Sequence, residues 1–490
     1  MFRKIKSFLF ENQHAKQTVA KNTFWLSIGT VASRVIKALI IIYAARILGA
    51  ENYGVFSYAL SLSAMFSIFA DIGMSAVLTR EASRDPENLE KNLGTSFVVK
   101  LSLVAFSFAL VALVAPIFST VKGAGLLMPL AALLVAFDAL RDFSFSITRA
   151  KERMEVEAAI GMTTGIAITV FGFIAIHVSP TPYSLLVGYV SGSALGFFLA
   201  FFLLREYVQR FWKSFDWSIA KNMLRDAAPL AIMGLLGALT INTDTIMLGW
   251  LKSATDVGLY AAAQRPVLLI YLISTLLATS IFPIISKLAH KNDERCRSIL
   301  EKTVSISLLA ALPIFVGGAV LSKQIVLFLF GSGYASIAPT FTMLLFTVVL
   351  IFPASIILNS VFAYGGQKIM LISAAIGGIG NVIFDFLLIP PFGIFGSAVA
   401  TVISQSLAYG LAWKRMKDLN NFYTLRYIKK GLLASAVMGV STYGLSLLGI
   451  QVVVNIVISA FIYFGTLTLL KEKLIKESLD IFRTEEPKAL

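Results

Sequence analysis

Cysteine and histidine are scarce in this chain. Its 490 residues include one cysteine, Cys296, and three histidines, His14, His177 and His290. A single thiol excludes an internal disulfide, and the scattered histidines lack the spacing of metal ligands. A glycine-rich phosphate loop is also absent, which argues against nucleotide hydrolysis by that route. We therefore expect no metal site, no cofactor and no enzymatic activity.

Charged residues are few as well. They form 14% of the chain, against about 25% in a typical soluble domain, while hydrophobic residues form 57% and the mean hydropathy is +0.81. A helix that spans a bilayer needs roughly 20 mostly apolar residues. The composition predicts an all-α integral membrane protein, located in the cell (cytoplasmic) membrane with many passes.

Fourteen apolar stretches are long enough to cross the bilayer. We expect transmembrane helices at residues 24–46, 54–79, 93–117, 124–147, 157–178, 183–204, 227–251, 258–285, 303–329, 337–363, 369–390, 393–413, 430–449 and 452–470. The cations between them alternate: 33 of the 42 lysines and arginines lie at the two ends of the chain and in even-numbered gaps or at their edges, whereas odd-numbered gaps and their edges hold only Arg46, Lys122 and Lys252. Cations mark cytoplasmic loops, so both termini should be cytoplasmic. The net charge of +15 therefore reflects membrane topology, and we expect no nucleic-acid partner.

The two halves of the sequence resemble each other. Residues 53–59, with Gly54 followed by Val55 and Phe56, match residues 257–263, with Gly258 followed by Leu259 and Tyr260. Each repeat holds six spans, so the lobes should form a parallel pseudo-two-fold repeat around a cavity, with two further C-terminal helices. We expect these parts: a cytoplasmic N-terminal segment 1–22, an N-lobe 23–205, a cytoplasmic linker 206–226, a C-lobe 227–415, the last two helices 416–470, and a cytoplasmic tail 471–490.

Several cations lie inside the predicted membrane helices. Ser27, Thr30, Arg34 and Lys37 share one helical face of the first helix. Charge at this depth is costly unless it faces a cavity or a counter-charge. One interpretation pairs these cations with acids on a neighbouring helix; the other, which we favour, is an anion site that faces the central cavity.

Three more cations need an explanation. Arg265 is a further candidate for the anion site, although an arginine two turns from the outer end can also extend to the interface. Arg141 is a fourth candidate, but Asp138 and Asp142 lie next to it and suggest a structural cluster. We expect Lys100, near the inner end of the third helix, to extend to the interface in the same way.

Acids within the spans are candidates for ion coupling. Asp71 follows Ser63 and Ser67 at helical spacing, Asp244 lies in the seventh span, and Asp385 continues a polar stripe from Gly377 and Asn381. A carboxylate in the membrane can bind H⁺ or Na⁺ and so couple transport to a gradient. It can equally be the fixed partner of a cation such as Arg34.

Several segments resemble the family of polysaccharide transporters, or lipid-linked oligosaccharide flippases, within the superfamily that also holds multidrug and toxic compound extrusion transporters. The residues that carry the resemblance are Ala45-Arg46-Ile47-Leu48-Gly49-Ala50-Glu51-Asn52-Tyr53-Gly54, Asp71-Ile72-Gly73-Met74, Asp244 with Gly258-Leu259-Tyr260-Ala261-Ala262-Ala263, and 388–398. The resemblance covers about residues 22–415. It implies two six-helix lobes, alternating access and a cargo on isoprenoid pyrophosphate. Asp385 stands where members often carry Asn, which points to a peculiarity in ion or substrate binding.

The sequence therefore predicts a flippase that moves an isoprenoid-linked oligosaccharide from the cytoplasmic to the outer leaflet for glycan biosynthesis. The expected partners are this substrate, membrane lipid, and a polymerase or glycosyltransferase. One alternative is a cation-coupled multidrug exporter, against which the cations on the first helix argue. Another is a non-transporting scaffold of a polysaccharide assembly complex, which has little reason to keep charges inside the membrane.

Overall fold

The structure is a computed structural model that describes residues 10–12, 15–84, 89–205, 215–291, 293–423 and 425–472. Throughout these residues the secondary structure is helical, and no strand occurs among them. By length and composition alone, ten helices in this part of the chain could cross a membrane. The all-α prediction is confirmed.

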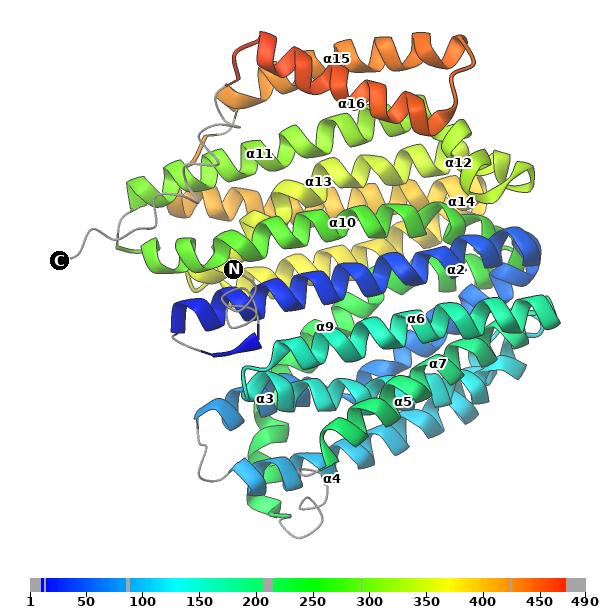
Figure 1. Cartoon of the computed structure of the whole chain (residues 1–490), viewed down its shortest axis with the longest axis vertical. Helices are drawn as coiled ribbons and strands as arrows, with labels where there is room; N and C mark the ends of the chain where they lie inside the picture. Colours follow the sequence, from blue (N-terminus) through cyan, green and yellow to red (C-terminus); the bar gives the residue numbers. More distant parts are fainter. Residues whose placement is uncertain are drawn as a thin grey trace. The chain divides into compact units, whose positions relative to one another are not determined.

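The first helices are α2 (Ala15–Phe66), α3 (Met74–Arg84), α4 (Leu89–Ala109), α5 (Ala124–Ala150), α6 (Met154–Val178), α7 (Pro182–Leu203) and α9 (Trp217–Leu251). Among them, α6 packs against both α2 and α7, and α5 packs against α7, α2 and α4 (Figure 1). The later helices are α10 (Ala254–Leu288), α11 (Asp293–Val320), α12 (Ser322–Phe330), α13 (Ala338–Ala363), α14 (Gln367–Asn420), α15 (Leu425–Leu447) and α16 (Val452–Leu469).

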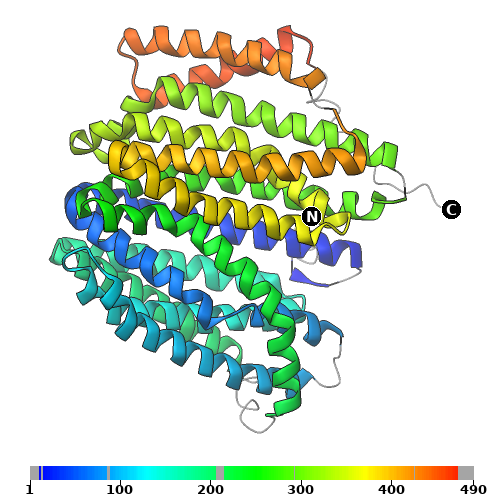
Figure 2. The ribbon, with the colours of Figure 1, turned by 180° about the vertical axis from the view of Figure 1, so that it is seen from behind.

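Helix α14 contains two of the predicted spans, and α2 contains the first span and the beginning of the second. Gly49 interrupts α2 with φ 70° and Gly393 interrupts α14 with φ 58°. Glycine adopts positive φ without the steric cost that a Cβ adds, so the chain can reverse at these residues. Figure 2 shows the yellow and orange halves of α14 side by side. At this packing, the Cβ position of Gly377 lies 3.6 Å from Ala408.

The predicted continuous helix at 54–79 is wrong. Helix α2 ends at Phe66, a 3-10 turn covers Ser67–Ala70, and α3 begins at Met74. The reason is local: Ile72 and Gly73 both have positive φ, and the Asp71 carboxylate accepts hydrogen bonds from the Ser75 backbone N–H at 3.2 Å and from the Ser75 hydroxyl at 2.6 Å. An aspartate that binds an N–H in the first turn favours a helix start.

Three predicted boundaries also need correction. Helix α9 begins at Trp217, so the second half of the predicted linker is helical, while residues 206–214 lie outside the described part. Asp216 fixes that start, because its carboxylate accepts from the N–H groups of Ser218 and Ile219 at 2.8 and 3.3 Å. At the N-terminus α2 already begins at Ala15, although the prediction places residues 1–22 before the first helix. The predicted span 303–329 divides into α11 and α12.

The chain separates into two compact units, Met1–Gly258 and Leu259–Leu490. The repeat assigns α9 to the second lobe, yet α9 packs in the first unit against α2, α3 and α4. There Met223 and Ala227 share an apolar core with Leu78 and Phe143. The unit boundary therefore falls at the first turn of α10, and the lobe boundaries stay a prediction of the repeat.

The glycine stripe 188–192–196 allows α6 and α7 to pack backbone to backbone. A Cβ at Gly192 would lie 2.4 Å from the Ile168 nitrogen, and one at Gly188 would lie 2.7 Å from the Gly172 Cα. Small residues permit such close approach between helices in a membrane. This packing places α6 beside the first half of α2, where the candidate site lies.

Candidate anion site

A cavity of about 240 Å³ lies inside the first unit, between α2, α5 and α6. Three cations that the sequence singles out line it together: Arg34 and Lys37 from α2, and Arg141 from α5. Among the other lining residues are Thr30, Ser33, Phe145, Glu157 and Thr164. Thr30, Arg34 and Lys37 thus share one helical face, as their spacing predicts.

Arg34 and Lys37 have no carboxylate within ion-pair distance among the described residues. The charges that act on the Lys37 amine come from Asp138, Arg141, Arg34 and Asp142. Opposite charges are therefore near Lys37 without forming a direct pair with it. The alternative in which these two cations are locked against acids is not found in the described part of the chain.

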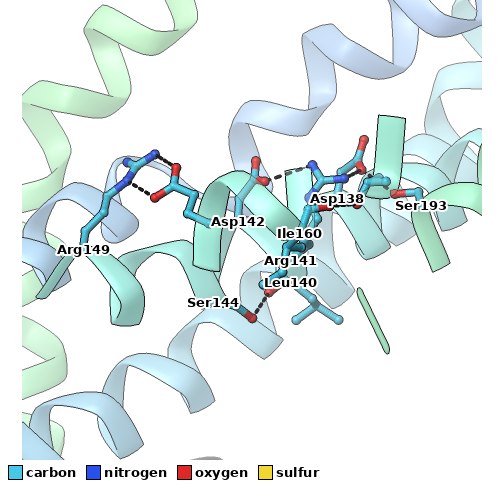
Figure 3. A network of polar contacts seen from close by, with 10 residues as sticks. Asp138, Leu140, Arg141, Asp142, Ser144, Arg149, Ile160 and Ser193 are labelled. Atoms are coloured by element: carbon cyan, nitrogen blue, oxygen red, sulfur yellow. Dashed lines mark hydrogen bonds and ion pairs between the residues drawn. The ribbon is translucent and has the colours of Figure 1, made fainter. Parts of the chain in front are cut away.

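Arg141, by contrast, is anchored by two acids of its own helix (Figure 3). Its Nη1 lies 2.7 Å from Asp138 Oδ1 and its Nη2 lies 3.0 Å from Asp142 Oδ1. The Ser193 hydroxyl of α7 donates to the same Asp138 oxygen. The Nε of Arg141 is buried and has no acceptor among the described residues. The structural cluster that the sequence suggests is present, and one arginine donor remains unused.

Glu157 is a lining residue that the sequence does not indicate. It is 8% exposed, and Arg149 binds its two carboxylate oxygens at 2.9 and 2.6 Å. Figure 3 shows Arg149, the partner of Glu157, in one view with Arg141, and both arginines belong to α5. A bidentate pair satisfies the acid and lowers its repulsion of an anion. In the sequence Glu157 is only an acid in the first turn of a helix, and its place in the cavity wall follows from the packing of α6 against α2 and α5.

The prediction that Lys100 extends to the membrane interface is wrong. The observed position of Lys100 also bears on the two interpretations of Asp71, as an ion-coupling site or as the partner of a cation. Lys100 is 1% exposed, and its Nζ lies 2.5 Å from Asp71 Oδ1. The buried amine does not extend to the interface, because it forms an ion pair with the partly exposed carboxylate of Asp71. Asp71 is therefore a fixed partner of a cation, although the cation is Lys100 and not Arg34.

The remaining candidates lie elsewhere on the helices. Asp244 is 1% exposed on α9 of the first unit. Arg265 lies on α10 of the second unit, and its Nε is buried without an acceptor in the described part. Asp385 is fully buried on α14, one turn after Asn381, whose amide lies 3.5 Å from the Thr401 hydroxyl. No cluster of metal-ligating residues occurs among the described residues.

The cavity has the chemistry of an anion site. Neither Arg34 nor Lys37 forms an ion pair with a carboxylate among the described residues, whereas Asp138 and Asp142 offset the charge of Arg141. Charge-assisted hydrogen bonds from such donors are strong in a medium of low dielectric constant. Threonine and serine hydroxyls beside them provide further hydrogen-bonding groups for an oxyanion.

In the described part of the chain, ten apolar helices long enough to span a bilayer, and a cationic cavity between α2, α5 and α6, are typical of a multi-pass membrane transporter. The chain belongs to the family described as "Polysaccharide biosynthesis protein", whose model matches residues 19–289. The family described as "MatE" matches residues 229–387. The protein is therefore a multi-pass protein of the cell membrane.

Relatives of similar length support the same family assignment. The "Probable low-salt glycan biosynthesis flippase Agl15" of Haloferax volcanii is 23% identical, over 92% of this chain and 96% of its own. Among solved structures, the lipid II flippase MurJ in an inward closed conformation superposes with a TM-score of 0.76 at 20% identity, covering 92% of this chain and 99% of its own. An inward-facing multidrug transporter of the MATE family gives a TM-score of 0.60 at 15% identity, over 86% and 99% of the two chains. At these identities the solved structures show the fold.

Proposed function

We propose that the protein is a flippase that moves an isoprenoid-(pyro)phosphate-linked oligosaccharide from the cytoplasmic to the outer leaflet by alternating access. The observation that carries this proposal is the cavity in which Arg34, Lys37 and Arg141 meet. A phosphate group that leaves water needs such cations at membrane depth. Agl15 is described as a probable glycan biosynthesis flippase and MurJ as a lipid II flippase, which supports the same function here.

The proposal includes a topology and an assignment of residues. Fourteen membrane helices would place both termini in the cytoplasm, with two six-helix lobes and two further helices. Arg34 and Lys37 would bind the (pyro)phosphate or acidic sugars, with Arg141 and Arg265 as further contacts. The lipid tail would stay in the bilayer, and the protein would act as a transporter without catalysing a reaction.

The cellular test is depletion of the protein followed by analysis of lipid-linked glycans. The proposal predicts that one lipid-linked oligosaccharide accumulates on the cytoplasmic leaflet. Arg34→Ala should cause the same accumulation at an unchanged protein level, because it removes a lining cation. Lys122→Ala, a change of an exposed cation at the predicted outer end, should export normally. Full export by Arg34→Ala would overturn the anion site.

Ion coupling is a separate part of the proposal. The burial of Asp385 and Asp244 supports them as sites for H⁺ or Na⁺. For Asp71, the ion pair with Lys100 supports a structural role instead, because the amine occupies the place of a coupling cation. Collapse of the H⁺ and Na⁺ gradients should slow export by the wild type. An export rate that stays constant on their collapse would exclude coupling.

A multidrug exporter is the second candidate, because the MatE model matches residues 229–387. A cationic drug would meet Arg34 and Lys37 in the cavity, and like charges repel. Efflux of ethidium from cells that overproduce the protein would favour this rival. A scaffold that does not transport would instead leave lipid-linked glycan export intact when Arg34 and Lys37 are both replaced by alanine.

A further inference from the structure

A second region of interest in the first unit lies outside the cavity, at the helix ends that the charge pattern assigns to the outer side of the membrane. Three connections meet there: the reversal at Gly49 in α2, residues 119–123 before α5, and residues 252–253 between α9 and α10. All three are odd-numbered gaps of the predicted topology.

Two glycines form the centre of this region. A Cβ at Gly54 would lie 1.8 Å from the Ala254 carbonyl oxygen, and a Cβ at Gly258 would lie 1.8 Å from the Ala50 carbonyl oxygen. Each added carbon would also lie 2.9 Å from the nitrogen of the other glycine. The contact is therefore reciprocal, backbone against backbone, and leaves no room for a side chain.

The reciprocity follows the internal repeat. The same spacing of 204 residues separates Ala50 from Ala254 and Gly54 from Gly258. Gly54 and Gly258 are also the glycines that correspond in the two repeats. Equivalent segments that contact each other through equivalent residues lie about a local two-fold axis, as in an isologous interface.

A set of hydrogen bonds surrounds this glycine contact. The Trp250 indole N–H at the end of α9 lies 3.1 Å from the Tyr58 hydroxyl and 3.1 Å from the Phe118 carbonyl oxygen. Tyr58 donates to the same carbonyl at 3.2 Å, and the Thr120 hydroxyl donates to the Gly249 carbonyl at 2.8 Å. The end of α9 is thereby fastened to α2 and to the segment before α5.

We propose that this contact closes the outer end of the transport pathway. Gly54 and Gly258 form the two surfaces that meet, and the hydrogen bonds of Trp250 hold these surfaces together. Opening to the outer side would separate α2 from α9 and the first turn of α10 at this point. The inference rests on the proposed alternating access. It assigns to the two glycines a role that only residues without a side chain can perform, because any Cβ would prop the closure open.

The test measures the width of the outer end directly. Lys122 and Thr255 are both exposed, the first in the segment before α5 and the second in the first turn of α10. In a Cys296→Ala background, spin labels at Lys122→Cys and Thr255→Cys report their distance in nanodiscs by double electron–electron resonance. Without substrate we expect one dominant short distance. Gly258→Ala should raise the population of longer distances at least threefold, and Trp250→Phe, which removes the indole N–H donor together with part of the ring, should raise it less.

Gly237→Ala on α9 is the matched control, because a Cβ there meets nothing within 4 Å; its distance distribution should equal that of the parent. Thermal unfolding of each variant separates an opened closure from an unfolded chain. If Gly258→Ala folds and keeps the short distance, the closure is excluded. If it opens the outer end but geranyl diphosphoglucose never changes the distribution, the closure stands and the proposed substrate falls.

Discussion

The Nζ of Lys100 lies 2.5 Å from Asp71 Oδ1, so that a lysine on α4 holds the carboxylate that starts α3. One side chain of this pair is 1% exposed and the other is 36% exposed. Removal of the lysine would leave the partly exposed acid without its counter-charge. The pair therefore links the break in the second predicted span to the packing of α4.

Lys100→Leu should destabilise the protein by about 2 kcal/mol, less than the roughly 3–5 kcal/mol for a fully buried pair, because Asp71 is partly accessible. Thermal unfolding in detergent measures the change. The double variant Lys100→Leu with Asp71→Asn should recover part of the loss, since it removes the isolated charge. Equal stability of Lys100→Leu and the wild type would show that the ion pair contributes nothing.

The start of α9 should be sensitive to acid. Lys91, whose amine lies 2.8 Å from the Asp216 carboxylate, together with the N–H groups of Ile219 and Ser218, lowers the pKa of Asp216 below its usual 3.8. A lowered native pKa stabilises the folded state above pH 3.8, and this contribution is lost as the pH falls through the native pKa. Asp216→Asn should thus be less stable than the wild type at pH 7, and the difference should vanish in acid. Hydrogen exchange at the first turn of α9 measures it; a difference independent of pH would contradict the assignment.

The contact of α6 with α7 leaves no space at Gly192. Gly192→Ala should lower the free energy of unfolding by about 1–3 kcal/mol, the usual range for overpacking, because the new Cβ would lie 2.4 Å from the Ile168 backbone nitrogen. Gly410→Ala is the control, since its Cβ meets nothing within 4 Å and alanine favours a helix by up to about 1 kcal/mol. Unfolding temperatures of the two variants should move in opposite directions. A Gly192→Ala variant as stable as the wild type would show that the helices separate freely.

Periodicity predicts the all-helical class and the shared face of Arg34 and Lys37, because both depend on spacing along one helix. The break at Asp71 and the split of the span at 303–329 are missed, because an apolar run conceals a local cap or turn. The burial of Lys100 is misjudged, and the place of Glu157 in the cavity wall is missed, for a different reason. Their partners, Asp71 and Arg149, stand 29 and 8 residues away, and spacing in the sequence does not determine which side chains meet between helices.

The most direct test of the central claim is flipping of a fluorescent isoprenyl diphosphosugar in liposomes that contain the purified protein. Both phosphates of this probe are esterified, so its charge stays constant over the pH range used. We expect transfer by the wild type and by Lys122→Ala, and at least a tenfold loss in the Arg34→Ala, Lys37→Ala double variant, because both uncompensated cations of the cavity are then gone. Transfer by the double variant at the wild-type rate would contradict the account.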